Sequence, residues 1–311
     1  MGTEPDRDFV GYAAAPPNPK WPRGARLALN FVLNYEEGAE YCVLNGDRHS
    51  ETMLSELGMQ PAYQGQRNLN MESSYEYGSR AGIWRILGVF EERQVPLTLY
   101  GVGLALERNP AVAEQAAKHG CDIVGHGWRW IDYRDVPEDV EREHIARCRD
   151  TIERLTGHRP VGWFTGRPSI NTRRLVVEEG GFLYDSDAIN DDLPYWVKIG
   201  DRHHLVICHT FDTNDGRFSR GQGFVTAQDW FVYMRDAFDW LYDEGEHAPK
   251  LLTVAMHCRM LGRPGRIGAL TRLLDHIDEH SNVWLCRREE IARHWYAQHA
   301  PTGVALPTRN V

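Results

Sequence analysis

Two adjacent glutamates, Glu36 and Glu37, follow a run of apolar, β-forming residues in the segment "LALNFVLNYEEG". A pair of like charges is unusual at the end of a buried strand, because burial and mutual repulsion both disfavour ionised carboxylates. Polar side chains that can move protons or stabilise negative charge also follow other β-rich runs, namely His126, Arg167, Asp185, Asp187, His257 and Arg259. Carboxylates, imidazoles and guanidiniums in one cleft are typical of a hydrolytic site, where proton transfer and stabilisation of negative charge are both needed.

Each of these residues has a simpler explanation when it is considered alone. A carboxylate after a strand often caps the next helix, and a histidine or arginine there often completes an ion pair. Because polar residues of these types follow five predicted strands, one shared site is a better explanation than five separate structural roles.

Short β-rich runs alternate with longer segments of helical periodicity, such as "SRAGIWRILGVFEERQ", and this order predicts repeated β-α units. Seven or eight units in 311 residues favour an α/β fold, a distorted (β/α) barrel of seven or eight parallel strands, with an open doubly wound sheet as the alternative. The loops after the strands of a barrel lie on one face, so this fold would gather the polar residues. The predicted strands are 26–33, 96–101, 122–125, 161–164, 182–184, 204–209, 251–256 and 283–286.

Charge and composition limit the partners of this chain. It carries 35 Lys and Arg against 44 Asp and Glu, and the net charge of -9 gives no basic excess for binding nucleic acid or an anionic membrane. No apolar run approaches the roughly 18 residues of a membrane span, and the first residues lack the pattern of a signal peptide, so we expect a cytoplasmic protein. Six cysteines without CxxC spacing indicate buried thiols. We expect a single catalytic domain over 1–311, with an extended arm (1–25), a barrel (26–290) and a C-terminal helix and tail (291–311).

The order of the polar motifs resembles that of the polysaccharide deacetylase (NodB homology) superfamily over roughly residues 26–290, which implies a NodB-type barrel. The resemblance places Glu36 of "NYEEG" at the catalytic base of the family's "TFDDG" motif and Glu37 at a metal ligand. The motif "HGWRW" keeps His126 but has Trp130 where the second metal-binding histidine belongs. An indole N–H only donates hydrogen bonds and cannot bind a metal. At most two of the three protein ligands of a usual zinc site remain, so we expect no metal and no other cofactor.

These departures are similar to those of one branch of the superfamily, the cofactor-independent bacterial allantoinases. Matching segments include "RDFVGY", "FVLNYEEG", "HGxRWIDY", "GWFTGR", "NTRRLVxEEGGFLYDSD" and "HCRxxGRPGR". The resemblance implies a metal-independent hydrolase that opens the hydantoin ring of allantoin to allantoate in purine catabolism, with a small cyclic amide as substrate and a homo-oligomer, a tetramer, as the assembly. The alternatives are a metal-dependent deacetylase of N-acetylated sugars, a hydrolase of another cyclic amide or imide, and a binding module without activity.

Proton transfer needs a base, an acid and a carboxylate that orients the acid. Glu36 or Glu37 would take a proton from water, since burial and a neighbouring negative charge raise the pKa of a carboxylate toward neutrality. His257 stands at the family's late histidine and would protonate the leaving ring nitrogen. Asp187 would orient this histidine, with Asp185 as the other candidate.

The remaining candidates would bind the substrate. His126 would polarise the scissile carbonyl, Trp130 would pack on the flat ring, and Arg167 and Arg259 would hold its carbonyl oxygens as fixed donors. The predicted catalytic residues are Glu36, Glu37, His126, Asp187 and His257, and the predicted substrate-binding residues are Trp130, Arg167, Asp185 and Arg259.

Overall fold

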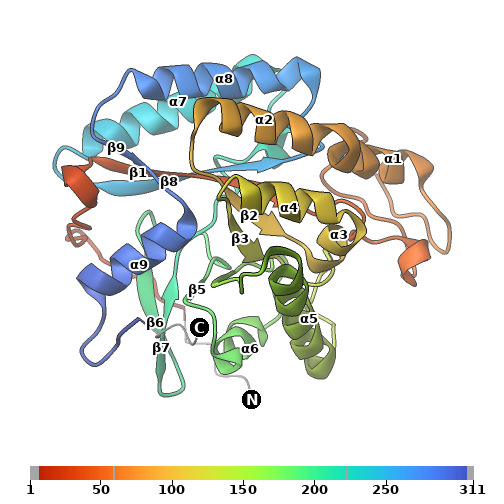
Figure 1. Ribbon diagram of the computed structural model, residues 1–311, viewed down its shortest axis with the longest axis horizontal. Coiled ribbons are helices and arrows are strands. Elements are labelled where there is room, and N and C mark those ends of the chain that lie inside the picture. The colour runs from red at the N-terminus through yellow and green to blue at the C-terminus, as the bar shows by residue number, and fades with distance from the viewer. Residues whose placement is uncertain (1–6, 59, 222, 307–311) are drawn as a thin grey trace.

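The longest strand, β1 (Leu27–Tyr35), is buried along its whole length, as is typical of a parallel strand covered on both faces. One side of β1 pairs with β8 (Lys250–His257). On the other side, its first residues pair with β9 (Val283–Leu285) and its last residues with β2 (Thr98–Gly101). β1 therefore links three neighbours and organises the sheet (Figure 1).

The structure is a computed structural model that describes residues 7–58, 60–221 and 223–306. Its sheet has the strand order β6-β7-β5-β4-β3-β2-β1-β8, with β9 beside β1. All of these pairings are parallel except the hairpin between β6 and β7. The strands not yet given are β3 (Asp122–Gly125), β4 (Gly162–Trp163), β5 (Tyr184–Asp185), β6 (Tyr195–Ile199) and β7 (Arg202–Val206).

The predicted α/β class and distorted parallel barrel are confirmed, with two corrections. All eight predicted strands are present and run parallel, but β6 is a ninth strand that is not among them. β6 (YWVKI) is only half-buried and pairs with β7 through a tight turn at Gly200, whose φ is +57°. In the described chain β6 and β8 form the two ends of the sheet, which curls into a half-barrel without closing.

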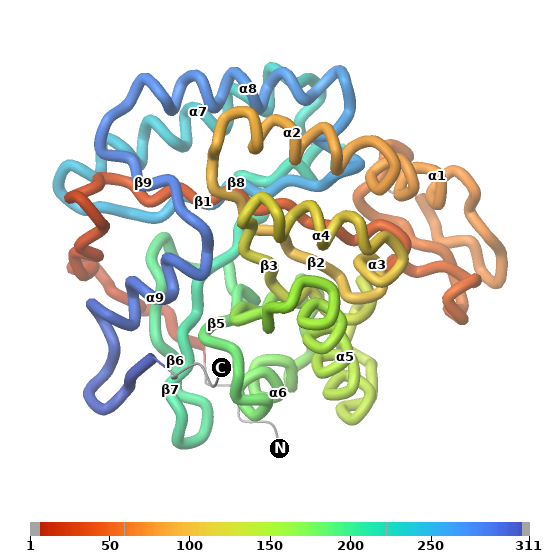
Figure 2. The backbone as a smooth tube through the Cα atoms, viewed as in Figure 1, coloured from red at the N-terminus to blue at the C-terminus, as the bar shows by residue number. Residues whose placement is uncertain are grey.

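Two apolar cores cover the two faces of the sheet, and the alternation of side chains along β1 assigns residues to them. The odd-numbered residues Leu29 and Phe31 belong to the outer core, with side chains from α2, α7 and α8. The even-numbered residues Ala28 and Val32 belong to the inner core, which contains Trp295 of α9. Figure 2 shows α2, α7 and α8 together on one side of β1 and α9 on the other.

The helices that follow the strands are amphipathic and turn their apolar sides to these cores. Thr226 caps α7 in a capping box with Asp229. The aromatic stripe of α7 is mainly core, because Trp230, Met234 and Phe238 are buried. No helix of the described residues combines the length and the apolar character that crossing a membrane requires. The helices are α1 (Leu69–Tyr77), α2 (Ile83–Arg93), α3 (Gly103–Arg108), α4 (Pro110–Lys118), α5 (Glu138–Thr156), α6 (Thr172–Glu179), α7 (Ala227–Glu244), α8 (Pro264–Asp278) and α9 (Arg288–His299); short helical turns are η1 (Pro22–Gly24), η2 (Val43–Asn45), η3 (Gly78–Gly82) and η4 (Asp215–Ser219).

The cysteines and the ends of the chain can be compared with their predictions. All six cysteines are free, and five are buried while Cys121 is half-buried. The predicted arm (1–25) and the C-terminal tail lie partly outside the described residues, and the single-domain division stays a prediction.

Candidate active site

The side-chain alternation that assigns β1 to two cores also separates the two glutamates. Glu36 continues the even-numbered series and lines the interior of the curl, whereas Glu37 continues the odd-numbered series. The Glu37 carboxylate lies against Gly78, where a β-carbon would overlap with it. Gly38 has a φ of +92°, which turns the chain away directly after the pair. Adjacent positions in the sequence thus place two carboxylates on opposite sides of one strand end.

Arg259, two residues after β8, connects the two carboxylates. Its Nη2 donates to Glu36 Oε2 at 2.5 Å, and its Nη1 donates to Glu37 Oε1 at 3.1 Å. Its Nε donates to the carbonyl oxygen of Leu54 at 2.6 Å, and the guanidinium carbon lies 3.9 Å from the ring centre of Tyr75. Arg259 is completely buried and its donors bind protein atoms. The prediction that it holds substrate oxygens is therefore wrong, and Arg259 positions the carboxylates.

The two carboxylates share one guanidinium but differ in their other neighbours, and their pKa values shift in opposite directions. Burial acts to raise the pKa of Glu36, but the charges of Arg259 and His257 and a hydrogen bond with His126 hold it well below its ordinary value. Burial raises the pKa of Glu37, with Arg259 opposing the shift and Glu36 adding to it. The expected upward shift is thus correct for Glu37 and wrong for Glu36. At neutral pH the ionised carboxylate that faces the interior is Glu36.

His126, directly after β3, has one ring nitrogen fixed by the backbone. Its Nδ1 lies 2.8 Å from the carbonyl oxygen of Phe164, which can only accept, so Nδ1 carries a hydrogen. Its ring also stacks on that of Phe164, with centres 4.9 Å apart. Its Nε2 lies 3.2 Å from Glu36 Oε1. His126 can therefore share a proton with Glu36, which leaves no free donor for the predicted polarisation of a carbonyl.

His257, the last residue of β8, lies on the other side of the same carboxylate oxygen. Its Nε2 is 3.6 Å from Glu36 Oε1, and its Nδ1 is 2.6 Å from Asp215 Oδ1. Burial acts to lower the pKa of His257, but the negative charges of Glu36 and Asp215 raise it to about 9. The imidazole is therefore protonated at neutral pH, as a general acid must be.

Asp215, which the sequence analysis does not identify, replaces Asp187 as the partner of His257. Asp215 is the first residue of η4, and its Oδ2 also accepts hydrogen bonds from the backbone of His257 at 2.8 Å. Asp187 instead accepts the backbone N–H groups of Thr165 and Gly166, each at 2.9 Å. Burial, together with the charge of Asp185, raises the pKa of Asp187 to about 6. The prediction that Asp187 orients His257 is wrong.

Asp185 forms a separate buried ion-pair network. It accepts from Arg173 Nε at 2.8 Å and lies 3.1 Å from His204 Nε2. Burial acts to raise the pKa of Asp185, but Arg173 and His204 together lower it below its ordinary value. Its oxygens accept from Arg173 and from the backbone N–H of Asp187, so Asp185 fills a structural role, which corrects its prediction as a substrate-binding residue.

Several of the candidate catalytic side chains surround a cavity of about 200 Å³ inside the end of the half-barrel. This volume is below the roughly 300–1,000 Å³ of pockets for drug-sized ligands, so it suits a small molecule. Two arginines of the segment after Asn214, Arg217 and Arg220, add positive charge to the wall. The functional lining consists of Glu36, His126, Trp130, Arg167, His209 and His257.

Trp130 and Arg167 lie together in this wall. The guanidinium carbon of Arg167 is 3.7 Å from the ring centre of Trp130, and its Nη2 donates to Glu51 Oε2 at 3.1 Å. Glu51 is buried, so it fixes the guanidinium on the indole ring. The structure therefore brings both predicted binding residues to the cavity, with one indole face covered by the arginine.

His209 is a further cavity residue that the sequence analysis does not identify. Only 5% of it is exposed, and within the described chain its Nδ1 has no hydrogen-bond partner. Its Nε2 lies 3.5 Å from Asn214 Nδ2, and Asn214 Oδ1 accepts from the backbone of Gly216, which fixes the amide orientation. Nε2 therefore accepts and Nδ1 carries the hydrogen. Burial first, then the positive charges around it, lower the pKa of His209 well below its ordinary value, so the ring is a neutral donor.

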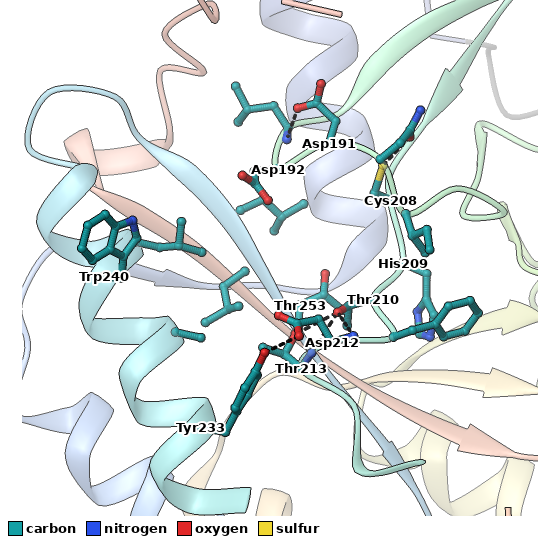
Figure 3. A pocket seen from close by; sticks show the side chains of 18 of the residues that line it. Asp191, Asp192, Cys208, His209, Thr210, Asp212, Thr213, Tyr233, Trp240 and Thr253 are labelled. Carbon is teal, nitrogen blue, oxygen red and sulfur yellow. Dashed lines mark hydrogen bonds between the residues drawn. The ribbon is translucent and has the colours of Figure 1, made fainter. Parts of the chain in front are cut away.

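The position of His209 could have been found from its place in the sequence. It is the last residue of the predicted strand 204–209, so it follows the same pattern as the other strand-end polar residues. A larger, more open cavity of about 920 Å³ lies beside it, between α7 and the edge of β8 (Figure 3). Tyr233 and Trp240 of α7 line that second cavity, which shares His209 with the first but is not lined by Glu36, His126 or His257.

The residues at the family's metal-binding positions do not fit a metal. Glu37 is bonded to Arg259, and His126 has its Nε2 at Glu36 and its Nδ1 at a carbonyl. Trp130 has no atom that can donate electrons to a metal. Among the described residues, a group of three possible ligands within reach of one ion occurs elsewhere, on α7 and α8. These positions therefore do not offer the ligand set of a metal centre.

Comparisons with known proteins agree with this architecture. The family model for polysaccharide deacetylase matches residues 70–179. A crystal structure of a protein from Pseudomonas aeruginosa PAO1, provisionally named a polysaccharide deacetylase, superposes with a TM-score of 0.93 at 53% identity, covering 95% of this chain and 99% of that one. A crystal structure of Puue allantoinase gives a TM-score of 0.93 at 52% identity, with the same coverage.

The family is shown by a relative that matches almost end to end. A protein of Schizosaccharomyces pombe, also provisionally named a polysaccharide deacetylase, is 42% identical over 313 residues, which is 94% of this chain and 98% of that protein. With its curled parallel sheet and its late histidine beside a strand-end acid, the chain belongs to the polysaccharide deacetylase family of hydrolases.

Proposed function

We propose that this protein is a metal-independent amidohydrolase that opens the hydantoin ring of allantoin to form allantoate, a step of purine catabolism. The observation that carries the proposal is the position of Glu36 Oε1, which lies 3.2 Å from His126 and 3.6 Å from His257 inside a small cavity. This arrangement supplies a base and an acid to one reacting centre. The 52% identity to Puue allantoinase supports the choice of substrate.

Ring opening requires the addition of water to a ring carbonyl and cleavage of its bond to the imide nitrogen. Glu36 is ionised because its pKa is held low, so it can accept the proton of the attacking water. The oxygen of that water bonds to the carbonyl carbon, and the carbonyl oxygen takes up the negative charge. A donor aimed at this oxygen lowers the barrier, since it stabilises charge that develops only in the transition state.

His209 is suited to this second role. Its buried Nδ1–H has no partner among the described residues, and its ring is neutral, so it can donate without being a competing acid. His257, whose pKa is raised to about 9, then gives its proton to the leaving nitrogen as the carbon–nitrogen bond breaks. His126 holds Glu36 in place through its contact with Oε1. Once His257 has given up its proton, it can take back the one that Glu36 accepted, because its Nε2 lies 3.6 Å from Glu36 Oε1. The products are a carboxylate and a ureido group.

These steps use no metal, because the site already contains a fixed positive charge. Arg259 places a fixed positive charge between Glu36 and Glu37. A hydantoin carbonyl is flanked by an imide nitrogen and is more electrophilic than the amide of an acetylated sugar. A base and a neutral donor can therefore suffice where a simple amide would need a stronger electrophile.

A metal-dependent deacetylase of N-acetylated sugars is the second candidate, because the chain belongs to the polysaccharide deacetylase family. Trp130 at the position of a metal ligand and the cavity of about 200 Å³ both favour the small cyclic amide. A different cyclic amide or imide would fit the same machinery.

One experiment separates these functions. Purified protein is exhaustively treated with a chelator, its metal content is measured, and allantoin hydrolysis is followed on the same sample. We expect full activity without metal. Activity that is lost on chelation and restored by zinc would indicate the deacetylase chemistry, and inactivity in both states would exclude allantoin and call for other cyclic amides.

The assembly and the location stay predictions of the family resemblance. We expect a cytoplasmic homotetramer, with a mass in solution four times the 35.7 kDa of one chain. Size-exclusion chromatography with light scattering measures this mass directly, and a monomeric mass would refute the tetramer.

A further inference from the structure

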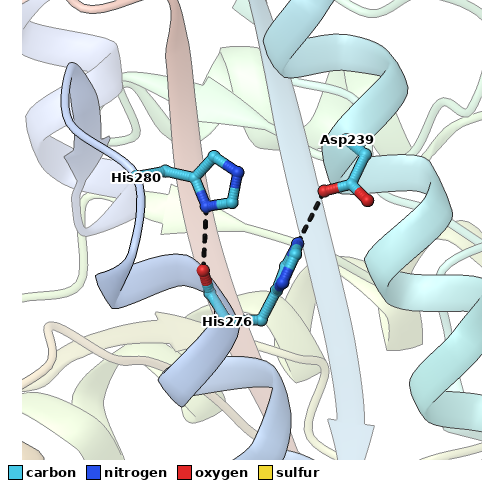
Figure 4. A group of neighbouring side chains, drawn as sticks. All are labelled: Asp239, His276 and His280. Atoms are coloured by element: carbon cyan, nitrogen blue, oxygen red, sulfur yellow. Dashed lines mark hydrogen bonds and ion pairs between the residues drawn. The ribbon is translucent and has the colours of Figure 1, made fainter.

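We propose a second site, remote from catalysis, at which Asp239, His276 and His280 bind a divalent transition-metal ion of the zinc class. Asp239 lies on α7, His276 in the last turn of α8, and His280 two residues after α8 ends. One ligand atom of each residue lies within 4.8 Å of the other two (Figure 4). The proposal concerns the outer helices and does not rest on the proposed function.

The ring of His280 is already oriented for binding a metal. Its Nδ1 lies 2.8 Å from the carbonyl oxygen of His276, so Nδ1 carries the hydrogen and Nε2 keeps its lone pair. Metal-binding histidines usually make such a contact with their second nitrogen, because it fixes the tautomer and the ring plane. Figure 4 shows the free nitrogen on the side of Asp239.

Aromatic neighbours hold this ring in place without a metal. Phe238 and Tyr242 pack edge-on against His280, each with ring centres 5.0 Å apart. The hydroxyl of Tyr242 donates to the carbonyl oxygen of Ser281 at 2.8 Å, which anchors the segment that carries His280. Little side-chain freedom remains to be lost when an ion binds, so the site is preorganised.

His276 and Asp239 share a proton, and a bound metal ion would take the place of that proton. His276 Nε2 lies 2.6 Å from Asp239 Oδ1. A zinc ion with bonds of about 2.0–2.1 Å needs its ligand atoms roughly 3.3–3.5 Å apart. The three ligand atoms lie within 4.8 Å of one another, so each pair differs from that spacing by at most roughly 1.5 Å. Two imidazoles and one carboxylate, with water in the fourth position, favour zinc and its transition-metal neighbours over magnesium or calcium, which prefer oxygen ligands.

Solvent has access to this group, since the side chains of His276 and Asp239 are 21% and 43% exposed. An ion bound there joins α7 to α8 on the outer face of β1 and β8, and the cavity around Glu36 takes no part in it. A purified sample can therefore carry zinc that its catalysis does not require.

The test is a zinc titration of the full-length, chelator-treated protein in competition with a chromogenic chelator. We expect one zinc per chain for the wild type. His276→Gln, His280→Phe and Asp239→Asn should each weaken the affinity at least 10-fold, since each removes one of three ligands. Cobalt(II) provides a second readout, because a tetrahedral site gives visible absorption bands that these variants would lose.

His119→Gln is the matched control. His119 also contacts a carboxylate, with Nε2 3.2 Å from Glu91 Oε2, but this pair has no third ligand in the described chain. The control should bind zinc like the wild type, and zinc should raise the melting temperature of both but not of His276→Gln. A wild type that binds no zinc, or ligand variants that bind as tightly as it does, would overturn the proposal.

Allantoin turnover, measured in the same samples, separates this proposal from the proposed function. Activity that is equal with and without zinc leaves both proposals standing. Activity that requires zinc in the wild type and in His276→Gln alike would contradict the metal-independent function. The outer site would then stand or fall on the zinc titration alone.

Discussion

Two arginines, Arg259 and Arg288, are both completely buried, and they lie near opposite ends of β1. Arg288, the first residue of α9, reaches the interior of the curl and donates to Asn30 Oδ1 at 2.9 Å and Ser186 Oγ at 3.0 Å. It also donates to Thr253 Oγ1 at 3.1 Å and to backbone carbonyl oxygens. These acceptors are neutral and do not titrate, so Arg288 ties α9 to the sheet.

At the other end of β1, Arg259 bonds to two carboxylates that do titrate. The pKa of Glu36 is lowered and that of Glu37 is raised. His126 and His257 both lie beside Oε1 of Glu36. A buried arginine therefore occurs both in the structural region around Arg288 and in the candidate active site around Arg259. The two regions differ in the partners of the arginine, which are neutral acceptors in the first and carboxylates in the second.

Glu36→Gln should have the largest effect, because it removes the base while keeping the shape of the side chain. We expect the turnover of allantoin to fall by about 10³- to 10⁴-fold, within the range for general acid–base residues. Kinetics of the purified variant measure this loss, and circular dichroism checks that it is folded. Substantial residual turnover would remove Glu36 from the role of base.

The Arg288 end of β1 supplies the control for Glu36→Gln. Asn30→Ala changes the Arg288 end of the same strand, about 20 Å away at roughly 3.3 Å per residue. It should lower the melting temperature while turnover stays within a few-fold of the wild type.

Arg259→Met should lower the stability at neutral pH by about 3–5 kcal/mol, because two buried carboxylates lose their cation. Without it, burial would raise their folded pKa values, and the instability should shrink as the pH falls and they become protonated. Arg288→Met leaves only neutral acceptors unpaired, so its loss should not depend on pH. Denaturant unfolding at pH 5 and pH 8 measures the loss of stability in both variants. An equal pH dependence of this loss would contradict the difference between the two regions.

His209 variants test the donor in the cavity wall. Phenylalanine keeps the ring but removes the N–H, and we expect the kcat for allantoin to fall by about 10²-fold with little change in KM, as for a lost oxyanion donor. Asparagine places an amide near the Nδ1 position, whereas glutamine places it near Nε2. His209→Asn should therefore retain more activity than His209→Gln, and the opposite order would place the donor on the other nitrogen.

The smallest expected effect is a shift in pH dependence. The pKa of His257 is raised to about 9, so activity that needs its proton should decline above that pH. In Asp215→Asn one of the two raising charges is lost, and the alkaline limit should move down by about one pH unit. A pH–rate profile measures the shift, and an unchanged alkaline limit would show that His257 is not the acid.

The same histidine affects stability in a direction that can be checked. Because its folded pKa lies above the unfolded value of about 6.5, His257 contributes stability that is fully present below that value and is lost as the pH rises through about 9. Asp215→Asn should reduce this contribution, which melting temperatures at pH 6 and pH 9 would reveal.

Several features of the molecule follow from local sequence. The short β-rich runs predict every parallel strand, and the polar residues after them predict where the site lies, because parallel strands present their carboxyl ends at one face. Glu36, His126, Trp130, Arg167 and His257 are all found at the cavity. β6 is not among the predicted strands, and in the described chain it pairs with one strand alone, its neighbour in the hairpin.

The partners of these residues depended on the tertiary structure. No spacing in the sequence shows that Asp215 rather than Asp187 bonds to His257, or that Arg259 turns to the glutamates instead of the cavity. The sequence alone determined which strand ends carry reactive groups, since hydrophobic periodicity is a local property. Only the packed chain decided which charges meet, because pKa values and hydrogen bonds depend on distances between residues that are far apart along the chain.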